Sequence, residues 1–446
     1  MKSASYIIIL LLLGACSMAT KEPVWITQRP ANTAYYSAVV RFSKKAPNYV
    51  DSARDNALRE ISTQISVQID SDIYLKETEA NGVPTEELIS QIRSSSRNKL
   101  NDIELAGSYE TDKDYWAYYR LSKSAYRAWR IGQRDIAVSS AKNLLAEYDS
   151  VTNDAVSGIT SLLKAMELIV DFTDLDLAVM YQGKEVNLYN ELFNRLHRLP
   201  ERLQPYMEET NLAVVAKLQR VYTVPAGITF ESETGKYPCR AFPLVFSFSR
   251  GKGDLVSNAQ TGGDGKTEMI LKRVEQFTTP QQIILSPDKN YWLQSLENPV
   301  VKRLFSSLKF PVATLYLQVS RPKAYIDYSF NDKPGTAYKE MLTNKLQDLD
   351  MDVVPDASAS DFTFKVMINS HEGDYVPRLK LYSATADAYV ELIATKQAKS
   401  IYNTNVTGIK CTGSTRENAL RNCELNGVAE ISDMLLFMLV EQYIMN

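Results

Sequence analysis

The chain has few of the residues from which metal and catalytic sites are built. Its 446 residues include only two histidines and four cysteines. These do not have the ligand spacing of a zinc site. His197 lies in a predicted helix and His371 in a predicted turn, where ordinary surface histidines are expected, and no Gly-x-Ser-x-Gly sequence occurs. We therefore expect no metal, no other cofactor and no enzymatic activity.

Two short matches to catalytic motifs have simpler explanations. Gly265-Lys266-Thr267 ends like a phosphate-binding loop, but Gln260 stands where that loop requires its first glycine. Ser139 and Lys142 fit Ser-x-x-Lys, yet the accompanying Ser-Asp-Asn and Lys-Thr-Gly sequences are missing. We expect a β-turn at the first site and an ordinary helix at the second. A periplasmic hydrolase whose site is assembled from residues distant in sequence is kept as the second alternative.

The chain also lacks a strong charge and a long apolar run. Its formal net charge is -3, which gives no electrostatic signature of nucleic-acid binding. The apolar run from Tyr6 to Leu13 has eight residues, too few to cross the ~30 Å core of a bilayer. With Lys2 before it, this run reads as a secretory signal.

The signal ends in a sequence typical of lipid attachment. Leu13-Gly14-Ala15-Cys16 resembles a bacterial lipobox, in which the chain is cut between Ala15 and Cys16 and the cysteine is acylated, commonly with palmitate. One acyl chain binds a membrane marginally, whereas the two or three of a lipoprotein bind lastingly. We predict a signal peptide at residues 1–15 and a lipidated tether at 16–24. The alternative is an ordinary signal peptide with an accidental cysteine.

The residue after Cys16 bears on the destination. By analogy with other lipoproteins, aspartate at this position favours retention in the inner membrane, and here the residue is Ser17. We expect anchoring in the outer membrane on its periplasmic side, with display on the cell surface as the alternative.

Residues 25–125 have the pattern of a small α/β domain. A strand is predicted at 35–42 and a helix after Asn48, with apolar residues three and four apart. Alternating polar and apolar residues then predict a strand at 65–75. A second helix is expected at 85–100, and two more strands at 103–110 and 115–121.

Several of these segments resemble the LPP-twenty lipoprotein family. The matching residues are Trp25-Ile26, Arg29-Pro30, the run from Ala53 to Ile61, Ile65 to Ile69, and Tyr115 to Leu121. The resemblance covers residues 25–125 alone and implies a bacterial outer-membrane lipoprotein. It implies no catalytic residues, and the usual glycines of the first strand are missing here.

The middle of the chain changes from helical to β patterns. Residues 126–222 are predicted as a helical region, including a short helix near 201–208. Short strands between glycine turns follow at 223–288 and predict a small β-sandwich. This segment resembles bacterial immunoglobulin-like modules, which usually act as spacers or adhesive surfaces.

The last part reads as a linker at 289–311 and a C-terminal α/β domain at 312–446. Its predicted strands lie at 313–320, 352–354, 362–369, 386–394 and 400–408, with helices at 336–349 and after Thr415. On the last helix, one stripe is expected to contain Ala419, Cys423, Gly427, Ile431, Met434, Met438 and Gln442.

The remaining cysteines leave two alternatives open. In an oxidising periplasm Cys411 and Cys423 could form a disulfide, or both could be free, partly buried thiols. Cys239 would then be unpaired and part of a core.

Taken together, the sequence predicts a multidomain α+β protein without catalysis. We expect a lipid-anchored scaffold or assembly factor for an envelope complex, with its membrane contact made by N-terminal acyl chains. Its other partners would be envelope proteins or peptidoglycan, and no nucleic acid. A glycan- or peptidoglycan-binding lipoprotein is the first alternative, because aromatic residues gather near 115–119.

Overall fold

The structure, a computed structural model, describes residues 22–30, 33–80, 103–152, 154–232, 235–277 and 280–444, with residues 69–80 described by their backbone alone. The signal peptide, Ala15, Cys16 and the helix expected at 85–100 lie outside these residues. The mixed α+β fold predicted from the sequence is confirmed. The chain forms two compact units. Unit 1 comprises Met1–Ala146, Ser161–Leu196 and Leu296–Phe305, and unit 2 comprises Glu147–Thr160, His197–Ser295 and Ser306–Asn446.

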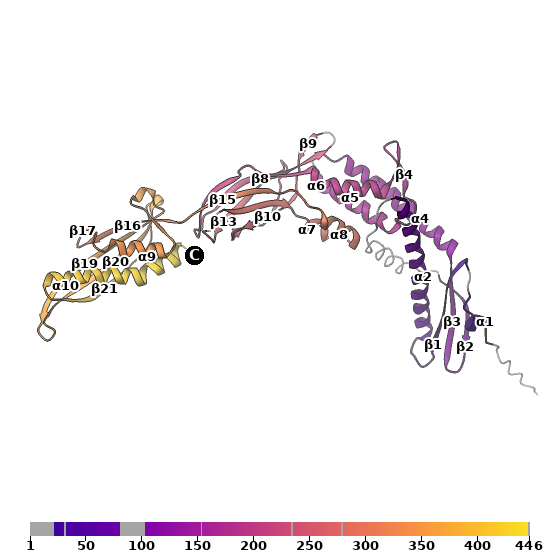
Figure 1. The fold of residues 1–446 in the computed structure, drawn as a ribbon, viewed down its shortest axis with the longest axis horizontal. Helices are drawn as coiled ribbons and strands as arrows, with labels where there is room; N and C mark the ends of the chain where they lie inside the picture. The colour runs from indigo at the N-terminus through magenta and orange to yellow at the C-terminus, as the bar shows by residue number, and fades with distance from the viewer. Residues whose placement is uncertain are drawn as a thin grey trace, which may run out of the picture. The chain divides into compact units, whose positions relative to one another are not determined.

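Unit 1 begins with a three-stranded antiparallel sheet and a long helix. The elements are α1 (Val24–Thr27), β1 (Tyr35–Ser43), α2 (Tyr49–Ala80), β2 (Glu104–Glu110) and β3 (Asp114–Ser122). The strand order is β1-β3-β2, so β1 is an edge strand. Helix α2 lies along one face of this sheet (Figure 1). Ala53, Ala57, Ile61 and Ile65 are fully buried on one side of the helix, as the spacing of the sequence predicts.

The strand predicted at residues 65–75 is wrong, because α2 continues through this segment. Ser66 is one of the polar residues that suggested alternation. Its hydroxyl, like that of Ser62 one turn earlier, is compatible with a helix. Ser62 Oγ donates to the Leu58 carbonyl at 2.6 Å, and Ser66 Oγ donates to the Ser62 carbonyl at 2.9 Å. Both hydroxyls are therefore satisfied inside the helix, four residues back along the chain.

The region predicted as helical at 126–222 contains three long helices and four strands. They are α4 (Lys123–Asp149), α5 (Ala155–Ile169), β4 (Ala178–Tyr181), β5 (Lys184–Asn187), α6 (Leu188–Arg202), β6 (Leu203–Met207) and β7 (Asn211–Val215), with a short 3-10 turn at Val170–Phe172. The helix expected near 201–208 is thus a strand for most of its length. Pro205 is tolerated there because β6 is the edge of its sheet.

Unit 2 contains two sheets built from residues 203–320. One has the order β12-β10-β14-β15-β7, and the other has β11-β13-β8-β6, with β9 paired to β8. The remaining bounds are β8 (Tyr222–Ser232), β9 (Gly235–Pro238), β10 (Pro243–Arg250), β11 (Gly253–Leu255), β12 (Asn258–Gln260), β13 (Lys266–Val274), β14 (Gln281–Pro287) and β15 (Ala313–Ser320). The immunoglobulin-like resemblance over 223–288 stays a prediction.

Two further segments contain elements that differ from those predicted. Strand β15, assigned from sequence to the C-terminal domain, pairs antiparallel with β14 and parallel with β7. Residues 289–311, expected to be a linker, hold α7 (Asn290–Leu293) and α8 (Pro299–Ser307). Trp292, Val301 and Phe305 are buried in these helices. The prolines that suggested a linker are compatible with this, because Pro299 stands at the first position of a helix.

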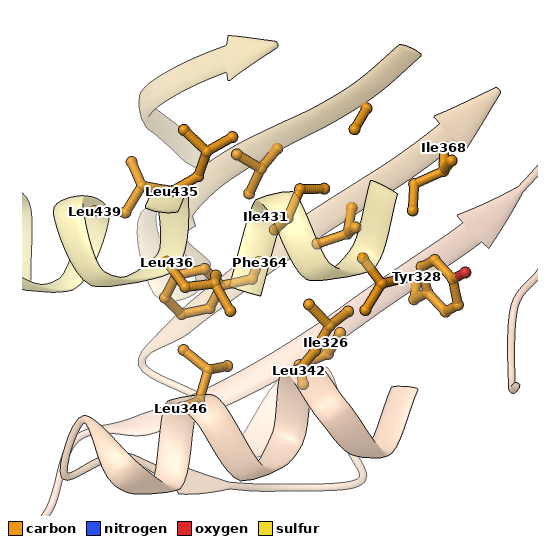
Figure 2. Packing of buried hydrophobic residues seen from close by; sticks show 14 of the residues in the cluster. Ile326, Tyr328, Leu342, Leu346, Phe364, Ile368, Ile431, Leu435, Leu436 and Leu439 are labelled. Atoms are coloured by element: carbon orange, nitrogen blue, oxygen red, sulfur yellow. The ribbon is translucent and has the colours of Figure 1, made fainter. Parts of the chain in front are cut away.

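The C-terminal domain is a sheet with helices packed on it. Its sheet has the order β17-β16-β19-β20-β21, with β18 beside β16. The bounds are β16 (Lys323–Phe330), β17 (Lys333–Pro334), α9 (Lys339–Asp348), β18 (Asp352–Val353), β19 (Phe362–Val376), β20 (Leu381–Ala394), β21 (Lys399–Gly413) and α10 (Arg416–Glu430), with 3-10 turns at Ala357–Ala359 and Thr395–Gln397. Figure 2 shows Leu342 and Leu346 of α9 and Ile431 beyond α10 packed near Phe364 of the sheet. Strand β16 was not predicted from the sequence.

The end of the last helix departs from the predicted stripe. Met434 is 59% exposed, and Leu435, Leu436 and Leu439 are buried in its place. Two π-helical turns, Ile431–Leu435 and Val440–Ile444, flank the short helix α11 (Leu436–Leu439). A π turn takes one more residue than an α turn. The buried side therefore moves forward by one residue after Ile431, and Met434 faces outward.

Candidate functional site

The aromatic residues of β3 divide between two sides of the N-terminal sheet. Tyr115 and Tyr119 are buried under α2, whereas Trp116 and Tyr118 are half-buried on the opposite side. This follows from the two-residue period of a strand. The aromatic cluster noticed in the sequence is therefore half core and half outer surface.

The outer side of this sheet is an aromatic face. We give this name to the half-buried residues Trp25, Tyr35, Tyr109, Trp116 and Tyr118. Trp116 is directly opposite Arg41 on β1 and Tyr109 on β2. The Trp25 ring from α1 lies 5.9 Å from that of Tyr118.

Arginines stack on the aromatic face and are held by carboxylates. The Arg41 guanidinium lies 5.2 Å from the Trp116 ring centre, and that of Arg120 lies 4.8 Å from the Tyr35 ring centre. Arg41 pairs with Asp114 at 2.6 Å, and Arg120 donates to both oxygens of Glu104 at 2.9 and 3.0 Å. The hydrogen bonds from Arg120 lower the pKa of Glu104. The carboxylates thereby help to hold the guanidiniums over the rings.

A glycine lets α1 reach the sheet. A Cβ placed on Gly107 of β2 would lie 3.2 Å from Nε1 of Trp25. Any larger residue at this position would push the indole away from the aromatic face. This contact was missed from the sequence, where Trp25 and Gly107 are far apart and no period connects them.

A polar groove runs along the free edge of β1. We call it the edge groove; it encloses about 310 Å³ and is lined by Arg29, Pro30, Tyr35, Ser37, Val39, Glu60, Gln64 and Lys123. Arg29 pairs with Glu60 of α2 at 3.1 Å. Three of the lining residues belong to β1, so the groove borders the aromatic face.

One glutamine occupies part of this strand edge. The Ser37 backbone N–H donates to Gln64 Oε1 at 3.2 Å, and Gln64 Nε2 donates to the Ser37 carbonyl at 2.7 Å. The amide of Gln64 thus imitates a neighbouring strand at a single residue. The N–H and C=O groups of successive residues in a strand point alternately to its two edges. Those of Val39 and Arg41 therefore point to the same edge as those of Ser37.

A second hollow in unit 1 is a helix-capping site. It encloses about 500 Å³ beside Glu167, Asp171 and Asn298. Glu167 Oε1 accepts hydrogen bonds from the backbone N–H groups of Glu297 and Asn298, at 2.6 and 2.8 Å. Asn298 Oδ1 in turn accepts from the Val300 N–H at 2.9 Å. These carboxylate and amide oxygens are used to start α8.

The site residues named from the sequence are dispersed. Cys411 of β21 and Cys423 of α10 form a disulfide with a Cα–Cα distance of 5.3 Å, one of the two alternatives left open. Cys239 is a buried free thiol, and burial raises its pKa to about 12. His371 lies 3.5 Å from an Asp387 oxygen on the surface. Gly265 has a φ of +75° in the turn before β13, where the sequence predicted a β-turn.

Comparisons with known proteins give structural likenesses alone. No protein-family model matches the chain, and no curated protein matches it. Among solved structures, lipoprotein GNA1162 from Neisseria meningitidis is 14% identical, with 27% of this chain and 96% of that chain covered and a TM-score of 0.18. Secreted protein HP1454 from Helicobacter pylori is 10% identical over 90% of this chain and 99% of that chain, with a TM-score of 0.20.

A third likeness is to protein XCC0632 from Xanthomonas campestris. It is 13% identical, with 28% of this chain and 86% of that chain covered and a TM-score of 0.21. The chain therefore has a distant structural similarity to bacterial lipoproteins and secreted proteins. At these scores the similarity carries no argument about activity or partners. In the part of the chain that the structure describes, no helix is long and apolar enough to cross a membrane.

Proposed function

We propose that this chain is a lipid-anchored protein of the bacterial envelope that works as a non-enzymatic scaffold or assembly factor. The anchor is supported by Ala15 and Cys16 at the end of a short apolar run. The scaffold role is supported by one structural observation, the edge groove beside the edge strand β1. An unpaired strand edge next to a groove is the geometry by which many proteins bind an extended segment of a partner.

The edge groove would bind a partner strand through backbone groups and side chains together. The outward N–H and C=O groups of Val39 and Arg41 supply hydrogen bonds, and Tyr35, Lys123 and Glu60 supply side-chain contacts in the groove. Other edge strands avoid such pairing with inward charges, bulges or prolines. Among the described residues, Gln64 covers the edge of β1 at Ser37.

Photo-crosslinking in cells tests this role. A benzoylphenylalanine at Arg41, which is exposed on β1, is expected to capture a discrete envelope protein. Benzoylphenylalanine in place of Thr63, which is exposed on α2, is the matched control and is expected to capture no protein. Equal patterns from both positions, or none from either, would reject the strand edge as the docking surface.

The anchor is tested by fractionation. Cys16→Ala removes the thiol that acylation needs, and the protein should then leave the membrane fraction or remain unprocessed. Ser17→Asp is the informative companion, because it keeps the lipid and should move the protein toward the inner membrane. A Cys16→Ala variant that fractionates as the wild type does would overturn the anchor, while an unmoved Ser17→Asp protein would count only against the outer membrane.

The aromatic face favours a second candidate, binding of a glycan such as peptidoglycan. Sugars stack on flat aromatic rings, and Trp116 and Tyr118 are half-buried on the outer side of the sheet, next to Arg41 and Trp25. Purified sacculi should then retain the wild-type chain and lose it on Trp116→Ala. Trp129→Ala, which removes an exposed tryptophan of α4, is the control and should bind normally. A wild-type chain that sacculi do not retain eliminates this candidate and leaves the scaffold proposal standing.

A further inference from the structure

The hairpin formed by β19 and β20 ends in a short, ordered loop. Tyr375 pairs with Tyr382 and Val376 with Leu381, and residues 377–380 connect them. The Leu379 N–H donates to the Val376 carbonyl at 3.1 Å, and the Lys380 N–H donates to the Pro377 carbonyl at 3.3 Å. We call residues 375–382 the hairpin tip. Its loop is drawn in orange beyond the first turn of α10 (Figure 1).

The hairpin tip exposes large apolar side chains between cations. Leu379 is 58% exposed and Tyr375 is 48% exposed. Arg378 and Lys380 flank Leu379, and both are exposed. A single exposed leucine is ordinary in a soluble protein. A leucine at the end of a loop, between two cations and above a pair of tyrosines, is a more specific combination.

Two acidic residues, Glu372 and Asp374, precede the hairpin tip on β19. Glu372 pairs with Arg416 at 3.7 Å. Asp374 precedes the hairpin tip, where its backbone carbonyl accepts the Ser383 hydroxyl at 2.8 Å. Within residues 375–382 the charged side chains are Arg378 and Lys380 alone. The loop is therefore positive at the point where it is most apolar.

The hairpin tip is held in one shape. The rings of Tyr375 and Tyr382 are 5.1 Å apart, and the Arg416 guanidinium lies 5.7 Å from the Tyr382 ring centre. A Cβ on Gly373 would lie 2.5 Å from Ser383 Oγ, so the two strands approach closely below the loop. These contacts pack the two strands together directly below the loop.

The opposite end of β20 provides an internal comparison. The turn between β20 and β21 also carries two exposed lysines, Lys396 and Lys399. Its other residues are Thr395, Gln397 and Ala398, with no large apolar side chain. The two ends therefore have the same number of cations. They differ in the apolar residues and in the ion pair that Lys396 forms with Asp361 at 3.5 Å.

We propose that the hairpin tip inserts into the headgroup region of an anionic phospholipid bilayer. Leu379 and Pro377 would enter the boundary with the acyl chains, Arg378 and Lys380 would meet lipid phosphates, and the tyrosines would lie at headgroup level, where aromatic residues concentrate. This membrane contact is separate from acylation at Cys16 and does not depend on the proposed scaffold role.

A fluorescent probe at the loop tests the insertion. The full chain carries Cys16→Ala, so that no acyl group forms, and Pro377→Cys labelled with nitrobenzoxadiazole. Vesicles of phosphatidylcholine with about a third phosphatidylglycerol should shift the emission to the blue. Phosphatidylcholine alone should give little shift. The matched control carries the probe at Gln397→Cys in the opposite turn and should show no shift with either vesicle.

Substitutions separate the contribution of the cations to membrane binding from that of the apolar side chain. Arg378→Gln with Lys380→Gln should raise the lipid concentration needed for half of the shift by about 30-fold, since each cation near an anionic surface contributes about 1 kcal/mol. Leu379→Ser should raise it by about tenfold. Lys396→Gln with Lys399→Gln should change it less than about twofold.

Three results would overturn the proposal. If the probe at Pro377→Cys stays in water with both vesicles, the hairpin tip does not insert into a bilayer. Equal shifts at Pro377→Cys and Gln397→Cys would mean general adsorption of the chain, including its apolar N-terminus. An equal response to the two kinds of vesicle would remove the role of Arg378 and Lys380.

Discussion

The Tyr328 hydroxyl donates a 2.7 Å hydrogen bond to Glu424 inside the C-terminal domain. Tyr328 on β16 is 4% exposed and Glu424 on α10 is 8% exposed. Burial, followed by the nearby carboxylate, raises the pKa of Tyr328. The contact joins a strand that sequence analysis missed to a helix that it predicted.

Removing this hydroxyl should destabilise the C-terminal domain. Tyr328→Phe leaves a buried carboxylate without its donor, which costs about 1–3 kcal/mol. The measurement is the urea midpoint followed by circular dichroism. Tyr325→Phe, on the same strand and half-buried, is the control and should change the midpoint little. If the two variants unfold alike, the hydrogen bond to Glu424 contributes nothing measurable.

A buried ion pair in unit 1 should be costly to break. Arg130 donates to both oxygens of Asp174 at 2.6 and 2.9 Å, and both side chains are buried. Asp174→Ala leaves a buried guanidinium and should cost about 3–5 kcal/mol. The exposed pair of Arg41 and Asp114 is the comparison, and Asp114→Ala should cost less than about 1 kcal/mol. Thermal unfolding of both variants measures the difference, and comparable losses would contradict it.

The disulfide should stabilise the C-terminal domain. It closes a short segment, with a sequence separation of 12 residues between Cys411 and Cys423. In the chain-entropy picture such a closure contributes about 3 kcal/mol. Reductant should therefore lower the unfolding midpoint of the wild type and leave that of Cys411→Ser with Cys423→Ser unchanged. If reductant does not change the unfolding midpoint of the wild type, the two thiols are not joined in solution.

The free thiol should be protected at neutral pH. Because burial raises the pKa of Cys239 to about 12, the folded protein holds this proton more tightly than the unfolded chain, whose cysteine titrates near 9. Its contribution to stability is therefore complete below about pH 9 and is lost as the pH rises toward 12.

Thiol labelling checks this protection. In the Cys16→Ala chain, a thiol reagent should modify Cys239 at pH 8 only as fast as the protein unfolds, and immediately in urea. Cys239→Ala should make stability less sensitive to pH between 9 and 12. Rapid labelling of the folded chain would show that the thiol is accessible.

The π turns at the end of the chain predict that truncating Leu439 and truncating Met434 have very different effects on stability. Leu439 is fully buried and Met434 is mostly exposed, although the predicted stripe placed Met434 in the core. Leu439→Ala should cost about 2–5 kcal/mol, and Met434→Ala less than about 0.5 kcal/mol. Urea unfolding of the two variants decides between the helical registers, and a larger loss for Met434→Ala would restore the regular one.

The sequence was most informative where a single period extends over a whole element. The buried side of α2 and the existence of strand β3 were predicted because neighbours along the chain carry the signal. It failed where the deciding contact lies elsewhere. Nothing local to residues 313–320 indicates pairing with β7, about a hundred residues earlier.

The candidate site shows the same division. Trp116 and Tyr118 were noticed as part of an aromatic cluster, but their separation from Tyr115 and Tyr119 depends on which side α2 covers. The edge groove was not foreseen, because Arg29, Ser37 and Gln64 meet only after folding. Cys16, the residue on which the anchor depends, is recognised from sequence context alone.

The Gln64 amide on Ser37 also limits what β1 can recruit. A second strand laid along this edge would find the Ser37 position taken, and the Ser43 carbonyl already accepts the Ala46 N–H at 3.1 Å. This leaves residues 39–42 to pair, and four residues span roughly 13 Å. That length suits one short recognition peptide, and it is too short to template the stacking of whole chains into a fibre.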